Sequence, residues 1–132
     1  MEGYGMQVKK NNTIQYDGVN ALAWSNMGME YVGLGMAREA YFAYTNAIRY
    51  NPEDVEGHHN LAVFFLKEGE PKKALEHALE TISLNANMAD SMYVASVAYK
   101  MLGDDENARK YCIMYGLNGG EVMVLKKKLA SL

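Results

Sequence analysis

Apolar residues along most of this chain recur at intervals of three and four, the spacing that places them on one face of an α-helix. Two such runs occupy residues 21–54, and Gly33 and Gly35 separate them. Pro52 follows the second run and Pro71 opens a later one, and both positions suit a residue without an amide hydrogen. The pattern predicts an all-α chain with paired helices over about 20–32 and 36–50, 55–67 and 71–84, and 89–102 and 105–117.

Polar residues at the predicted helix starts support these boundaries. Asn20 and Asp104 are suitable caps, and Glu70 lies close to a helix start. Asp105 and Glu106 follow Asp104 and place negative charge at the positive end of a helix. We therefore interpret this acidic trio as helix chemistry and not as a metal site.

The pairs are copies of one unit that recurs with a period of about 34 residues, which is typical of helix-turn-helix arrays. The first copy carries Trp24, Met27, Gly28, Tyr31, Gly35, Ala40, Tyr44, Ala47 and Pro52. The second and third copies carry Leu61, Ala62, Phe65, Gly69, Ala74, Ala78 and Thr81, then Ala95, Ser96, Tyr99, Gly103, Ala108, Cys112 and Tyr115.

This series of large, glycine, aromatic, alanine and proline positions resembles the tetratricopeptide repeat (TPR) family, and the first copy is the most complete. The later copies depart from the family pattern at His58, Ala86, Ser96 and Cys112. The resemblance implies an α-α superhelix, a right-handed stack of three repeats with a C-terminal capping helix. We place the repeats at 21–54, 55–88 and 89–120.

The two ends of the chain fall outside the repeats. Residues 1–20 contain Gly3, Gly5 and the pair Asn11-Asn12, which weaken a helix. The order of residue types in 14–18 nevertheless matches the end of each repeat, so a degenerate half-repeat and a flexible leader both stay open. Residues 121–132 place four apolar residues on one stripe, which predicts an amphipathic capping helix more strongly than a membrane or partner helix.

Composition excludes several classes of protein. The 132 residues are 49% hydrophobic and 22% charged, as in ordinary globular domains, and the net charge of -3 gives no general attraction to nucleic acid. Because Cys112 is the single cysteine, an intrachain disulfide is ruled out and a reducing, cytoplasmic location is the natural expectation. No apolar run is long enough to span a membrane, and we expect no membrane partner.

The residues that could take part in catalysis or metal binding do not form a catalytic set. His58 and His59 are adjacent, His77 is distant, and no pair has the spacing of a helical metal site. The ten methionines suit packing better than soft-metal binding, and Cys112 sits at a packing position. We expect no enzyme activity, no cofactor and no metal, and keep a metal-binding protein as a third, least favoured hypothesis.

The family resemblance implies a concave wall lined by the first helix of each repeat. Equivalent positions give one candidate surface for a protein or peptide partner: Ser25, Asn26, Met29 and Val32; His59, Asn60, Val63 and Leu66; and Tyr93, Val94, Val97 and Lys100. Some of these side chains are equally well explained as packing between repeats.

Family co-chaperones hold a terminal carboxylate with a clamp of lysine, asparagine and arginine. Here only Asn60 matches that clamp, because Ser25, Met29, Asp90 and Val94 replace its other members. Losing those donors removes the charge-assisted hydrogen bonds that a carboxylate needs. The sequence therefore predicts a non-catalytic protein-protein interaction module or scaffold with a concave peptide-binding face and no clamp, with a homo-oligomerisation unit as the alternative.

Overall fold

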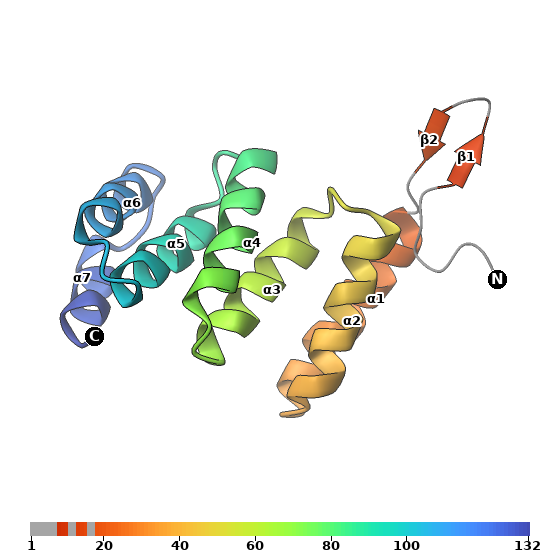
Figure 1. The fold of residues 1–132 in the computed structure, drawn as a ribbon, viewed down its shortest axis with the longest axis horizontal. Coiled ribbons are helices and arrows are strands. Elements are labelled where there is room, and N and C mark those ends of the chain that lie inside the picture. Colours follow the sequence, from red (N-terminus) through yellow and green to blue (C-terminus); the bar gives the residue numbers. More distant parts are fainter. Residues whose placement is uncertain (1–7, 11–12, 16–17) are drawn as a thin grey trace. The chain divides into compact units, whose positions relative to one another are not determined.

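The computed structural model of the chain describes residues 8–10, 13–15 and 18–132. Two short strands precede a series of helices in this part of the chain (Figure 1). The elements are β1 (Val8–Lys10), β2 (Thr13–Gln15), α1 (Gly18–Gly33), α2 (Ala37–Tyr50), α3 (Val55–Lys67), α4 (Pro71–Leu84), α5 (Ala89–Met101), α6 (Asp105–Leu117) and α7 (Val122–Ala130). Two compact units, Met1–Leu61 and Ala62–Leu132, divide the chain within α3.

The N-terminal strands correct one of the two interpretations of residues 1–20. β1 and β2 pair antiparallel, with Val8 opposite Gln15 and Lys10 opposite Thr13. A degenerate repeat helix over 14–18 is therefore wrong for residues 14 and 15, where β-branched Thr13 and Ile14 favour an extended backbone. Residues 1–7, 11–12 and 16–17 lie outside the described ranges.

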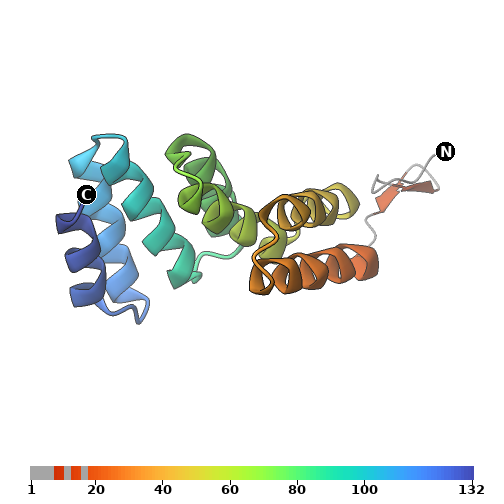
Figure 2. The same cartoon turned by 90° about the horizontal axis from the view of Figure 1, so that it is seen from below.

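The first unit is built on the antiparallel pair α1 and α2, which lie side by side (Figure 2). Ala40, Ala43 and Ala47 of α2 are fully buried, and their small side chains let the two helices approach closely. Tyr44, also buried, lies against Gly28 of α1. The packing thus depends on a glycine on one helix and a ring on the other.

Glycines in the left-handed conformation end the first helix of every pair. Gly35, Gly69 and Gly103 have φ angles of 73°, 75° and 82°, and they recur with the repeat period. The residue after each glycine donates its amide to a carbonyl five residues earlier, a Schellman-type end that closes the last helical turn. These bonds are Met36 N to Tyr31 O, Glu70 N to Phe65 O and Asp104 N to Tyr99 O, each 2.9 Å long.

Small corrections to the predicted helix ends follow from these turns. α1 begins at Gly18, so Asn20 lies inside the helix and is not its cap. Gly33 is the last residue of α1, and Gly35 alone has the positive φ that the turn requires. Asp104 was placed correctly, because its side chain accepts the amide of Asn107 at the start of α6.

The second unit has its core beneath α7. Leu125 of α7 is fully buried together with Val97 of α5 and Cys112 of α6, and Tyr93 and Leu129 pack against this cluster. The residues after the third pair therefore form the predicted capping helix, which lies beside α6 (Figure 2).

Candidate functional site

On α1, the four predicted partner-binding residues separate into two groups. Asn26, Met29 and Val32 are exposed, as a binding surface requires. Ser25 is buried, and its hydroxyl donates to Asp54 Oδ2 over 3.0 Å. The same carboxylate oxygen accepts the amide of Gly57 over 3.0 Å, so Ser25 helps to fix the start of α3. The expectation that Ser25 faces a partner is corrected accordingly.

On α3, all four candidates are half-buried. His59, Asn60 and Val63 lie in the middle of the helix, while Leu66, near its end, packs against the cluster beneath α7. The side-chain nitrogen of Asn60 is buried and has no hydrogen-bond partner among the described residues. A buried amide nitrogen in this state is uncommon in folded proteins.

On α5, burial removes two of the four candidates. Val94 is buried, and Val97 is 1% exposed in the core with Cys112 and Leu125. Val97 is therefore no part of an exposed binding face, because α7 covers that position. Tyr93 is half-buried with its ring edge-on to Tyr115, and Lys100 pairs with Asp105.

An apolar stripe on α1 adds Val19 and Leu22 to the predicted binding residues of that helix. Val19 is 81% exposed and Leu22 55% exposed, and Met29 is 54% exposed. Positions 19, 22, 26 and 29 follow a helical spacing of three and four, so these side chains share one face with Asn26. The helical spacing of these four positions is the sequence signal that could have identified this face.

The groups with a shifted pKa lie at a helix cap or where helices pack against one another. Hydrogen bonds from the side chain and the backbone of Asn107 lower the pKa of Asp104, the cap of α6. Burial raises the pKa of Tyr44 beneath α1 and, together with Tyr111 and Asp104, that of Tyr99. Each shift arises where helices begin or pack.

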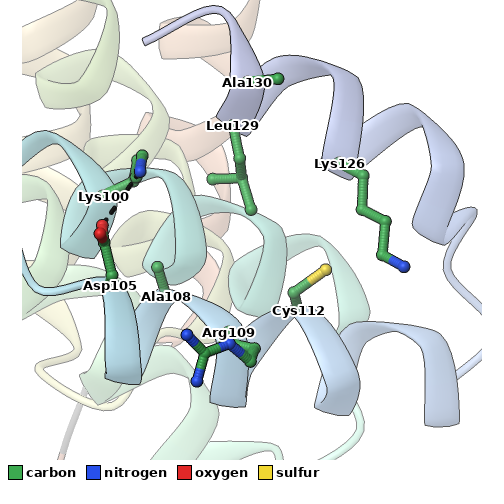
Figure 3. Close-up of a pocket in the computed structure, with 8 residues that line it drawn as sticks. All are labelled: Lys100, Asp105, Ala108, Arg109, Cys112, Lys126, Leu129 and Ala130. Atoms are coloured by element: carbon green, nitrogen blue, oxygen red, sulfur yellow. Dashed lines mark hydrogen bonds and ion pairs between the residues drawn. The ribbon is translucent and has the colours of Figure 1, made fainter.

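Two adjoining pockets lie between α6 and α7, within the second unit. One has a volume of about 300 Å³ and is bordered by the cations Lys100, Arg109 and Lys126; Figure 3 shows Leu129 and Cys112 pointing into the space between the helices. The other, of about 690 Å³, shares Arg109, Cys112 and Lys126 and is otherwise apolar. Neither pocket follows from the amphipathic pattern of residues 121–132, because that pattern identifies only the apolar stripe of α7.

Residues 8–10, 13–15 and 18–132 contain no group of three or more histidine, cysteine, aspartate or glutamate side chains arranged to hold a metal ion. Within those same ranges, every helix is too short or too polar to cross a bilayer.

Comparisons with known proteins agree on one fold. Two sequence profiles described as tetratricopeptide repeat match residues 21–54 and 43–76. No curated protein sequence matches the chain significantly. Among solved structures, the first TPR of Spaghetti (RPAP3) bound to the HSP90 peptide SRMEEVD is similar with a TM-score of 0.82 and 20% identity, over 90% of this chain and 97% of that one.

Two further structures show the same likeness. The TPR2B domain of yeast Sti1 in its pHsp70 complex has a TM-score of 0.77 at 20% identity, over 86% of this chain and 98% of that one. The TPR domain of Arabidopsis OM64 has a TM-score of 0.78 at 16% identity, over 86% and 96%. At these identities the likeness establishes the fold, and it confirms the predicted fold class.

Proposed function

This chain is a member of the tetratricopeptide repeat family, and on that premise we propose that it is a non-catalytic interaction module that binds a peptide segment of a partner protein. The binding surface is the exposed face of its first helix, α1, with Met29 as a central contact. Val63 on α3 lies at the position equivalent to Met29 in the second repeat and is half-buried. The single cysteine supports a cytoplasmic setting for this module.

The observation that carries this proposal is the apolar stripe on α1. Three large apolar side chains, Val19, Leu22 and Met29, lie exposed on one face around the amide of Asn26. Exposed apolar side chains gathered on one face are typical of interaction surfaces, and an amide among them can direct a peptide backbone. Methionine adapts its shape to different partners, which suits it to such a contact.

The chemistry of the stripe favours apolar anchors over a terminal carboxylate. Two of the similar structures are complexes, one with an HSP90 peptide and one with pHsp70. This chain has a buried serine at position 25 and an exposed methionine at position 29, where clamp-bearing relatives place lysine and asparagine. We therefore propose a partner segment whose leucine-like or aromatic side chains contact α1 and whose terminal charge is unimportant.

The experiment compares two methionines on the same helix. Met29 lies on the proposed face, whereas Met27 is 41% exposed and lies about 200° around α1 from it. A random-peptide phage library is selected on the full chain, and the recovered peptides are measured on Met29→Glu and Met27→Glu by fluorescence anisotropy. A buried glutamate without a partner should weaken binding at position 29 by about tenfold or more.

The outcomes separate clearly. Loss of affinity in Met29→Glu with near-unchanged affinity in Met27→Glu supports the α1 surface. Equal affinity of both variants for every recovered peptide overturns it. Far-UV circular dichroism of both variants confirms that the helices are intact.

Self-association is a second candidate function, favoured by a specific pair of rings. Phe42 of α2 is 59% exposed and packs edge-on against Trp24 with ring centroids 5.8 Å apart. An exposed ring that is supported by a half-buried one can anchor a second copy. Sedimentation of wild type and Phe42→Ser across concentration tests it, since a wild type that stays monomeric at every concentration removes this function.

A further inference from the structure

We infer that the groove between α6 and α7 is a second docking surface, for a peptide segment that carries carboxylate side chains beside apolar ones. The groove is the space formed by the two adjoining pockets described above, which share Arg109, Cys112 and Lys126. All of its lining residues belong to the second unit. The inference is therefore independent of the α1 surface proposed above.

Charge is the first reason for this occupant. The whole chain has a net charge of -3, yet residues 105–132 carry five lysines and arginines against three acidic residues. Three of the cations that line the smaller pocket, Lys100, Arg109 and Lys126, face a single lining carboxylate, Asp105. Asp105 lies 3.0 Å from Lys100, so its charge is already matched.

Arg109 and Lys126 have no acidic partner among the ion pairs of the described residues. Two unpaired cations on opposite helices beside a recess favour an anionic ligand, and arginine can hold a carboxylate through two parallel hydrogen bonds. The excess of cations in residues 105–132 makes this the part of the second unit to which an acidic segment is drawn.

The larger pocket provides the wall that would contact an apolar side chain of the ligand. Ile113 and Leu117 of α6 are exposed at its wall, and Val122 of α7 is half-buried there. A volume of about 690 Å³ accommodates one or more large side chains. Because the cations and the apolar wall share one groove, the ligand must place a carboxylate next to an apolar side chain.

A peptide fits this arrangement better than a lipid surface. The sulfur-bearing residue Cys112 at the floor is buried, and Leu129 points down into the same recess (Figure 3). A flat anionic surface would reach Lys127 and Lys128, which are exposed, without entering the recess. A peptide side chain can enter it, which is how peptide grooves generally gain specificity.

The test selects peptides on the full chain and compares two charge-matched variants. The probe is a random-peptide phage library, panned in parallel on wild type, on Arg109→Glu/Lys126→Glu and on Lys110→Glu/Lys127→Glu. Both variants change two cations of the same two helices, but Lys110 and Lys127 do not line either pocket. The control therefore has the same net charge without the change in the groove.

The inference predicts that peptides with adjacent acidic and apolar residues are enriched on wild type and on the control, and lost on Arg109→Glu/Lys126→Glu. For a purified peptide, anisotropy should show a Kd raised about tenfold or more in that variant. Asp105→Asn should tighten binding, because it removes the one carboxylate that lines the pocket and releases Lys100. Ile113→Ser should weaken it through the apolar wall.

Four results would overturn the inference. Peptides without acidic residues, or equal recovery on all three proteins, would show that the groove does not select a carboxylate. Binding of phosphatidylserine vesicles that depends on Arg109 and Lys126, in the absence of peptide enrichment, would assign the groove to a membrane. Peptides that are lost on Met29→Glu but kept on Arg109→Glu/Lys126→Glu bind the α1 surface, and recovery of such peptides alone would overturn the inference as well.

Discussion

Replacement of Gly28 by alanine tests the close approach of α1 and α2. A Cβ atom at this position would lie 2.5 Å from Tyr44 Cδ1 and 2.9 Å from Tyr44 Cζ, distances shorter than carbon atoms tolerate. Tyr44 is buried, so its ring has no solvent to move into. The added methyl group must therefore displace the ring or push the two helices apart.

The size of the effect follows from two opposing contributions. Glycine to alanine inside a helix normally stabilises by about 1 kcal/mol. Overpacking of a buried site normally costs about 1–3 kcal/mol, and contact with several atoms of one ring places this site in the upper part of that range. We expect Gly28→Ala to lower the free energy of unfolding by about 1–2 kcal/mol.

Gly33→Ala is the matched control on the same helix. A Cβ at position 33 meets no heavy atom within 4 Å, and this glycine is not among those with positive φ. The control should therefore be neutral or gain up to about 1 kcal/mol. Urea denaturation followed by circular dichroism measures both variants, and the two midpoints should differ by about 1 M or more.

A third variant identifies the cause. In a Tyr44→Leu background the ring is absent, so Gly28→Ala should cost less than it does in the wild type. If Gly28→Ala is as stable as Gly33→Ala, or if its cost is unchanged by Tyr44→Leu, the close contact between glycine and ring does not determine how α1 and α2 pack.

Three further predictions concern the second unit. Leu125→Ala should lower the free energy of unfolding, measured in urea, by about 2–4 kcal/mol because it opens a cavity in the core beneath α7. Leu132→Ala, at an exposed position, should change it by less than about 0.5 kcal/mol. Equal effects of the two variants would contradict the capping role of α7. Ser96→Ala removes a buried 2.6 Å hydrogen bond from α5 to the backbone of α6 and should cost about 1 kcal/mol in the same assay, whereas an unchanged midpoint would show that the bond adds nothing. Hydrogen bonding lowers the pKa of Asp104 in the folded state, so its cap stabilises α6 fully above about pH 4 and less as the pH falls further. The difference in unfolding free energy between wild type and Asp104→Ala should therefore become smaller in acid. A difference that does not change with pH would refute this.

The helices were predictable from sequence because residues at or next to their ends determine where they begin and end. Pro71 begins α4, Asp104 caps α6, and left-handed glycines recur at 35, 69 and 103. Periodic apolar residues place the helices, and these residues end them. The hairpin β1–β2 was missed because the residue order in 14–18 imitates the end of a repeat.

The candidate site was less predictable, because helical spacing identifies a face but not what covers it. Val97 has the spacing of a groove residue, yet α7 buries it; Ser25 likewise is held by Asp54, some thirty residues away. Leu22 belongs to the apolar pattern of α1 and is nevertheless exposed. Whether each of these three side chains is buried or exposed depends on its tertiary neighbours, and the sequence does not place those neighbours.

The proposed function depends on the apolar stripe of α1, and one comparison of affinities tests it most directly. Peptides recovered on the full chain are titrated against Met29→Glu and its counterpart Met27→Glu. The account predicts that at least one class of peptide loses about tenfold or more in affinity for Met29→Glu alone. Retention of full affinity by that variant for every peptide would contradict it.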